Sequence, residues 1–114
     1  MMDCVFCKIA AGVIPGSTVY QDELVFAFRD IHPMAPCHIL IIPRKHYTSM
    51  NELKAKDVAL AGHMLLVAQK LAQEEGVAES GYRLVVNCGP QGGQVVMHLH
   101  LHLLGGRELS GELG

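Results

Sequence analysis

Three histidines stand at alternate positions near the end of the 114-residue chain: His98, His100 and His102, each followed by a leucine. Because side chains alternate across a strand, the three imidazoles are predicted to share one face, with the leucines pointing into the core. Neighbouring histidines on that face would lie roughly 6.5–7 Å apart. Neutral imidazole is a good nucleophile near pH 7, so the pattern favours covalent catalysis. The alternatives are a histidine-rich surface strand and a simple metal site.

A second reactive pair stands at the start of the chain, where Cys4 and Cys7 form a C-x-x-C motif. The first residues lack the layout of a signal peptide, so we expect a cytoplasmic protein whose cysteines are thiols or metal ligands. A redox motif is disfavoured because no predicted strand precedes it. Two buried thiols without metal remain an alternative, and Cys37 and Cys88 are expected to be ordinary small residues.

Bulk composition limits the classes of partner. The length predicts a single domain over residues 1–114, and 50% of the residues are apolar. The net charge is −2 and no basic stripe is present, so nucleic-acid binding is not expected. No stretch is long enough to cross a bilayer, so no membrane partner is expected. A domain of this size buries a modest fraction of its surface, and a metal or second subunit would supplement it.

The periodicity predicts an α+β fold with a mainly antiparallel sheet, because strands precede and follow one long helix. The expected strands are Thr18–Gln21, Leu24–Arg29, His38–Pro43, Tyr82–Asn87 and Val95–Leu104. A short helix is expected over residues 3–11, a capping box at Ser49–Glu52 and the long helix over Asp57–Glu75, ending before Gly76. The long helix is apolar over much of its girth, which indicates two buried faces, one against the sheet and one against a partner subunit.

Nearly the whole chain resembles the histidine triad (HIT) family, and within it the Hint branch of purine nucleoside phosphoramidases. The resemblance depends on ordered motifs: Phe6-Cys7-Lys8-Ile9, Phe28-Arg29-Asp30-Ile31, Ala35-Pro36, His38-Ile39-Leu40-Ile41-Ile42-Pro43, Gly81-Tyr82-Arg83-Leu84-Val85-Val86-Asn87, Gly92-Gly93-Gln94, the histidine segment and Leu103-Leu104-Gly105-Gly106-Arg107. It implies a five-stranded antiparallel sheet with one long and one short helix. It also implies a homodimer in which the two sheets join.

The resemblance further implies a hydrolase that cleaves nucleoside 5′-phosphoramidates or acyl-nucleotides. His100 matches the nucleophile that forms a nucleotidyl-histidine, which water then hydrolyses. A purine nucleotide of the AMP or GMP type is the implied substrate or product. The remaining implied site residues are His102, Asn87, Gly93 and Gln94 at the phosphates, Asp30 at the ribose, Phe28 and Ile31 at the base, and His38 behind the triad.

Each of these residues also has a structural interpretation. Asn87 or Gln94 would close a hairpin, and Asp30 would form an Asx turn before Pro33. Phe28 and Ile31 would be core, and His38 a satisfied core histidine. Two other functions compete with the phosphoramidase: a dinucleoside polyphosphate hydrolase, and a nucleotide- and zinc-binding module with incidental catalysis.

Some family members bind zinc, and the matching residues here are Cys4, Cys7, His46 and His98. Four protein ligands close the coordination sphere, so such a zinc ion would be structural, and no divalent cation is expected in catalysis. One position departs from the family: Val95 stands where many Hint members carry a serine that bonds the phosphate or leaving group. Protonation of the leaving group would then come from His102 or water.

Overall fold

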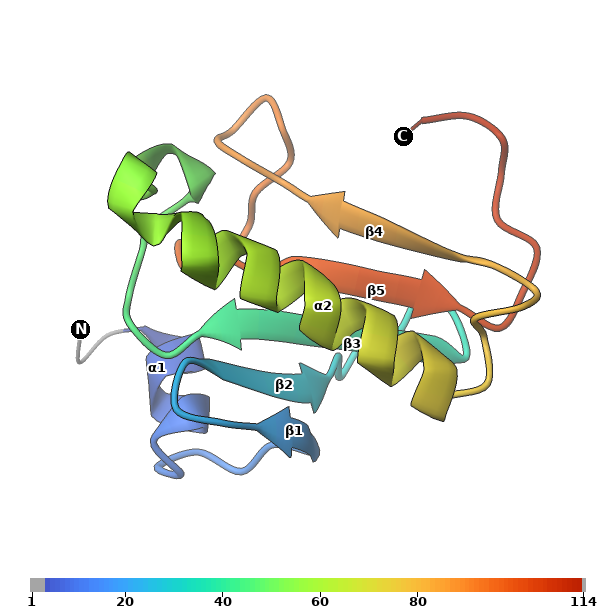
Figure 1. Cartoon of the computed structure of the whole chain (residues 1–114), viewed down its shortest axis with the longest axis horizontal. Coiled ribbons are helices and arrows are strands. Elements are labelled where there is room, and N and C mark those ends of the chain that lie inside the picture. Colours follow the sequence, from blue (N-terminus) through green and yellow to red (C-terminus); the bar gives the residue numbers. More distant parts are fainter. Residues whose placement is uncertain (1–3, 114) are drawn as a thin grey trace.

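The computed structural model describes residues 4–113, which form two α-helices, two short 3₁₀ helices and five strands (Figure 1). The helices are α1 (Val5–Ala10) and α2 (Val58–Glu74), and the 3₁₀ helices are η1 (Met50–Glu52) and η2 (Ala55–Asp57). The strands are β1 (Thr18–Gln21), β2 (Val25–Arg29), β3 (Cys37–Pro43), β4 (Tyr82–Val86) and β5 (Leu101–Gly105).

One sheet contains all five of these strands in the order β1-β2-β3-β5-β4, and every neighbouring pair is antiparallel. The predicted α+β class with a five-stranded antiparallel sheet, one long helix and one short helix is therefore confirmed. The central strand β3 is buried at every position, as its continuous apolar run predicts. None of the helices in residues 4–113 combines the length and apolar character that crossing a bilayer requires.

The two faces of the sheet pack against different helices (Figure 1). α2 lies across one face, where Met64, Val67 and Leu71 meet alternate residues of β3 and β5 in the larger apolar cluster. The other face carries a smaller cluster: Phe6 of α1 with Phe26, Phe28, Leu40 and Ile42. The period-2 pattern of the strands therefore separates a helix-covered core from a second face that α1 covers in part.

The predicted final strand, Val95–Leu104, was wrong at its start, because β5 begins at Leu101. Ile41 pairs with Leu101, and the same register would place Pro43 opposite Leu99. Pro43 has no N–H to give to a ladder, and its carbonyl accepts a hydrogen bond from the ring of His98 instead. The N–H of Leu99 donates to the Tyr47 carbonyl. The pairing of β3 with β5 therefore ends before the first two histidines.

Smaller differences lie at the element ends. The short helix begins at Val5 with Cys4 as its N-cap, and residue 3 of the predicted helix lies outside the described residues. The Ser49 hydroxyl caps η1, but the Glu52 carboxylate accepts from the Thr48 N–H, one residue before the position that a capping box uses. The capping signal therefore starts a 3₁₀ turn, and α2 follows from Val58.

Candidate functional site

The histidine segment keeps its alternation although its first half leaves the ladder. Leu99, Leu101 and Leu103 are buried in the cluster under α2. The imidazoles lie on the opposite face, where the edge of Phe6 meets the ring of His100 at a centroid distance of 5.2 Å. His102 sits opposite Leu40 in the ladder, so it shares this face with the smaller cluster. The segment from His98 to Leu103 thus has buried leucines on one side and a row of imidazoles on the other.

His98 is fully buried and lies at the centre of a sulfur–nitrogen cluster. Its Nε2–H donates to the Pro43 carbonyl over 2.9 Å. A neutral ring carries one N–H, so Nδ1 is left with a lone pair. Nδ1 lies 3.2 Å from Cys4 Sγ, 3.5 Å from Cys7 Sγ and 3.2 Å from His46 Nδ1. Burial lowers the pKa of His98, which keeps the ring neutral near pH 7.

These four side chains fit a zinc ion. Their donor atoms all lie within 4.8 Å of one another, and tetrahedral zinc with sulfur and nitrogen ligands holds its donor atoms roughly 3.3–3.8 Å apart. The N–H on the far side of the His98 ring is bonded to a backbone carbonyl, which is how zinc-binding histidines are usually oriented. The four ligand positions expected from the family resemblance, Cys4, Cys7, His46 and His98, therefore converge.

His100 is buried, and its ring is oriented by its own chain. Its Nδ1–H donates to the backbone carbonyl of His98 over 2.7 Å. In the neutral ring this bond places the proton on Nδ1 and leaves the lone pair on Nε2. The ring of His102 lies 4.9 Å away between centroids. The arrangement presents one imidazole with an available lone pair beside a second imidazole.

His38 is buried, and a hydrogen bond joins it to the half-buried His102. His38 Nε2 and His102 Nδ1 are 3.0 Å apart, and the Met34 N–H donates to His38 Nδ1 over 3.0 Å. Burial, with the neighbouring imidazoles of His100 and His38, lowers the pKa of His102 to about 4. Burial also lowers the pKa of His38, against the opposing effect of the Asp30 carboxylate. Both rings are therefore neutral near pH 7.

Asp30 forms the Asx turn that its position before Pro33 predicts, and its second oxygen faces the imidazole row. One carboxylate oxygen accepts from the His32 N–H over 2.8 Å, which is the Asx turn. The other oxygen lies 3.5 Å from His38 Nε2. This carboxylate is thus held at the edge of the imidazole row.

The glycine-rich turn is held by the side chains that were expected to contact phosphate. The Asn87 amide donates to the Gly92 carbonyl over 2.8 Å. Gln94 is buried: its oxygen accepts from the Gly89 N–H and its amide donates to the carbonyls of Thr48 and Val96. Gly93 adopts a φ of 78°, where glycine carries no steric penalty. The Gln94 side chain therefore shapes the turn rather than facing outward from it.

The three residues expected near the base and the leaving group differ in exposure. Phe28 is a core residue, and its ring packs edge-on against the ring of Phe6 with 5.3 Å between the centroids. Ile31 and Val95 are 84% and 87% exposed, so their side chains are available to a ligand. Sequence reasoning did not assign a contact to three groups: Phe6 against His100, the Pro43 carbonyl and the Met34 N–H. The motif Phe6-Cys7-Lys8-Ile9 could have indicated the contact of Phe6 with His100. The two backbone groups could not have been predicted, because the pattern of side chains does not reveal them.

Comparison with known proteins supports one family. The HIT domain model matches residues 11–109. The chain is 51% identical to the purine nucleoside phosphoramidase of Escherichia coli (strain K12) over 107 residues, or 94% of this chain and 90% of that protein. It is 47% identical to a 14 kDa zinc-binding protein of Zea mays, covering 93% of this chain and 84% of that protein.

Solved structures agree with the sequence matches. The crystal structure of a HIT family hydrolase from Legionella pneumophila Philadelphia 1 matches with a TM-score of 0.96 and 52% identity, covering 98% of this chain and all of that one. A histidine triad protein from Clostridium difficile matches with a TM-score of 0.96 and 46% identity, covering 99% and 98% of the two chains. With the fold, the histidine row and these matches together, the chain belongs to the HIT family.

Proposed function

We propose that this protein is a nucleotide hydrolase that cleaves nucleoside 5′-phosphoramidates or acyl-nucleotides through a covalent intermediate on His100. The observation that carries the proposal is the hydrogen bond from His100 Nδ1–H to the His98 carbonyl. It leaves Nε2 with a lone pair and fixes the direction in which the ring can attack. The likeness to the phosphoramidase of Escherichia coli supports the same reaction class.

The proposed reaction has two steps. His100 Nε2 attacks the α-phosphorus, the bond from phosphorus to the leaving group breaks, and the leaving amine takes a proton from solvent while His102 bonds the departing group. Water then attacks the nucleotidyl-histidine, which releases the nucleoside monophosphate and restores the imidazole. A phosphorus–nitrogen bond replaces another in the first step, so amine leaving groups suit this nucleophile. The first nucleophile is a side chain and the second is water, so we propose that the reaction needs no divalent cation.

We assign the binding of a purine nucleotide to the groups around the imidazole row. Backbone N–H groups of the turn that holds Asn87, Gly93 and Gln94 would bond the phosphates. Asp30 would bond the ribose hydroxyls, and Ile31 and the edge of Phe28 would contact the base. The exposed Val95 carries no donor, so the hydrogen bond to the leaving group is assigned to His102. We place the protein in the cytoplasm and treat residues 1–114 as one domain.

The first prediction concerns the nucleophile. His100→Ala lowers kcat/KM for an adenosine 5′-phosphoramidate by at least about three orders of magnitude, because the attacking atom is lost. Binding of AMP, measured by calorimetry, stays close to that of the wild type. The matched control is His63→Gln, on α2 across the sheet, which keeps turnover.

Three results would contradict the proposed function. If His100→Ala turned over substrate at the rate of the wild type, His100 would not be the nucleophile. A wild-type protein that binds AMP but releases no amine would favour a binding module. A dinucleoside polyphosphate cleaved in preference to the phosphoramidate would favour the second enzyme class.

We also propose that Cys4, Cys7, His46 and His98 hold a structural zinc ion. Their convergence and the name of the Zea mays relative support this. When bound, the ion would tie α1 to the strand end at Pro43, because its ligands come from α1, the segment after β3 and the segment before β5. It would supply stability, since all four positions are filled by protein.

Metal analysis tests the zinc proposal. The purified protein is expected to contain about one zinc per chain, and a chelator is expected to lower its melting temperature, because a ligand that binds the folded state stabilises it. Cys7→Ser should lose both the zinc and the chelator sensitivity, whereas Cys88→Ser should keep both. Equal metal content in the Cys7→Ser protein would rule out this ligand set.

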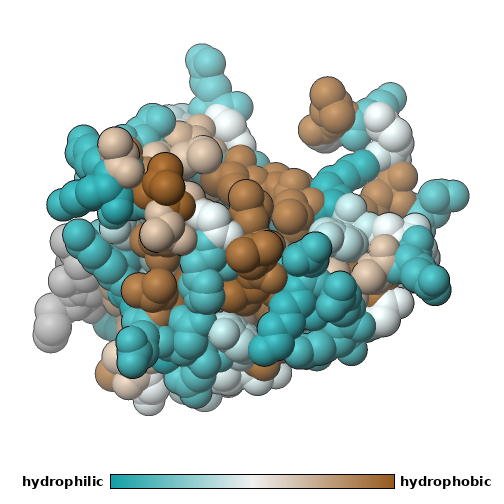
Figure 2. Space-filling model, viewed as in Figure 1, coloured by the Kyte–Doolittle hydropathy of each residue, from teal (hydrophilic) through white to brown (hydrophobic). Residues whose placement is uncertain are grey.

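We propose a homodimer in which the sheets of two copies join along β4. β4 is an edge strand in the described sheet, and its sequence carries few of the charges that protect an edge. Beside it, apolar side chains gather between α2 and β4 (Figure 2). The large apolar residues of η1, α2 and β4 that are exposed are Met50, Val58, Leu65, Leu66 and Val86. Patches of this kind mark protein interfaces.

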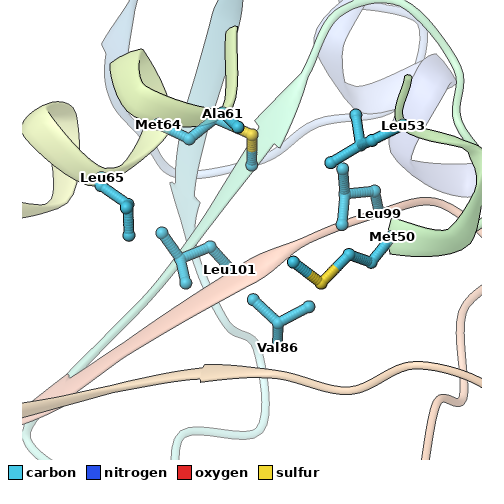
Figure 3. Close-up of a pocket in the computed structure, with 8 residues that line it drawn as sticks. All are labelled: Met50, Leu53, Ala61, Met64, Leu65, Val86, Leu99 and Leu101. Carbon is cyan, nitrogen blue, oxygen red and sulfur yellow. The ribbon is translucent and has the colours of Figure 1, made fainter. Parts of the chain in front are cut away.

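A small apolar cavity of about 110 Å³ lies within this surface (Figure 3). Met50, Leu65 and Val86 converge on it from η1, α2 and β4, and Leu99 and Leu101 form its floor. The floor belongs to the segment that carries the imidazoles. A second copy covering this cavity would therefore pack directly behind the proposed site.

Light scattering tests the assembly. The wild type should have twice the chain mass, and Leu66→Glu should give a monomer because it buries a charge in the proposed interface. Val13→Glu, at a residue 71% exposed in the loop after α1, is the matched control and should stay dimeric. A wild-type monomer at all concentrations would exclude the dimer.

A further inference from the structure

The ring of Phe6 lies between the sulfur–nitrogen cluster around His98 and the proposed nucleotide site. It meets the ring of His100 at 86° with 5.2 Å between the centroids, and the ring of His98 at 63° with 6.0 Å. It also meets the ring of Phe28 at 70° and 5.3 Å. Phe6 thus contacts a proposed metal ligand, the proposed nucleophile and a residue assigned to the base, each in the edge-to-face arrangement that aromatic rings prefer.

The position of Phe6 is set by α1, a helix of six residues in which Phe6 is the buried residue. A helix this short is not stable on its own in water. Cys4 is its N-cap, and Cys4 Sγ accepts from the Cys7 N–H over 3.3 Å. These two thiols, on either side of Phe6 in the sequence, lie 3.2–3.5 Å from ring nitrogens of the cluster. A restraint on both thiols is therefore also a restraint on Phe6.

Further attachments of α1 lie at its far end. The Arg44 guanidinium donates to the Ala10 carbonyl over 3.2 Å. The half-buried Ile9 packs against the smaller apolar cluster. These contacts hold the last turn of the helix, whereas Phe6 is in the first turn beside the thiols. Release of the thiols would therefore loosen the part of α1 that carries Phe6.

We propose that Phe6 is a positioning residue through which metal binding at the cluster strengthens nucleotide binding beside His100, an inference that rests on the proposed function for the identity of the nucleotide. With the thiols joined to the imidazoles through the ion, the first turn of α1 is fixed, and the Phe6 ring stays packed against His100 and Phe28. Without the ion, that turn has more freedom, and part of the affinity for nucleotide is lost in ordering it.

Such coupling must act in both directions. If zinc raises the affinity for AMP by some factor, AMP raises the affinity for zinc by the same factor. An edge-to-face aromatic pair changes an equilibrium constant by a factor of about two to ten. The coupling carried by Phe6 should therefore be of that size.

A second route joins the two sites, and it involves no residue of α1. The backbone carbonyl of His98 accepts from His100 Nδ1–H, and the ring of His98 is bonded to the Pro43 carbonyl. Replacement of Phe6 leaves these two hydrogen bonds in place. A variant at Phe6 therefore separates the route through the helix from the route through His98.

Zinc affinity with and without AMP tests the coupling. Wild type and Phe6→Leu are titrated with zinc against a competing chelator, first without AMP and then with saturating AMP. We expect AMP to raise the zinc affinity of the wild type by about threefold to tenfold and that of Phe6→Leu by less than about twofold, because leucine keeps the apolar contact but lacks the ring. Val5→Ala, at a residue 40% exposed on the same helix, is the matched control and should keep the wild-type coupling.

The possible outcomes separate this proposal from the proposed function. An AMP effect of equal size in Phe6→Leu and the wild type would overturn the role of Phe6, because the coupling would then depend on His98 or on folding of the whole chain. AMP that binds the wild type without changing its zinc affinity would overturn the coupling and leave the proposed function intact. Absence of AMP binding by the zinc-loaded wild type would contradict the proposed function itself.

Amide hydrogen exchange of the wild type tests the cause without a variant at Phe6. In the metal-free protein we expect fast exchange in α1 while the central strand β3 stays protected, because the opening is local. Zinc should protect α1, and AMP added to the metal-free protein should protect it in part. Equal protection of α1 with and without zinc would overturn the proposal. Loss of protection in β3 without zinc would also overturn it, because the whole fold would then depend on the metal.

Discussion

The hydrogen bond from His98 Nε2–H to the Pro43 carbonyl organises the functional face of this protein. It occupies the carbonyl where the ladder between β3 and β5 would continue, so the chain leaves the sheet at the first histidines. It turns His98 Nδ1 toward the two thiols and His46. It also holds the backbone of His98, whose own carbonyl accepts from His100 Nδ1–H. One buried ring thus connects the cluster of Cys4, Cys7 and His46 to the proposed nucleophile.

A consistent principle runs along the imidazole row: a backbone group behind each ring decides which nitrogen is free. Carbonyls lie behind His98 and His100, and an amide lies behind His38. Buried polar groups must be paired, so each neutral ring adopts the tautomer that its backbone partner requires. Rings of one residue type thereby acquire different roles. The leucines between them keep this row in place, because their burial under α2 resists any slip of the segment by one residue.

Periodicity was sufficient to predict the elements that depend on it. The alternation from His98 to Leu103, the apolar run of β3 and the helical pattern of α2 all appear in the structure. The start of β5 was not predictable from its own residues, because Pro43, far away in sequence, ends the pairing. Gln94 was expected at the phosphates, but its amide holds the turn to Thr48. The role of the Met34 amide leaves no trace in any side chain, since every residue except proline carries one.

We propose that His100 becomes covalently attached to the nucleotide during turnover. The most direct measurement is mass spectrometry of the protein quenched during hydrolysis of an adenosine 5′-phosphoramidate, followed by fragmentation of the peptide that contains residues 98–102. We expect an added nucleotide mass on His100, which disappears when the substrate is exhausted. A nucleotide attached to another residue, or rapid-quench samples that contain unmodified protein alone while amine is released in a burst, would contradict it.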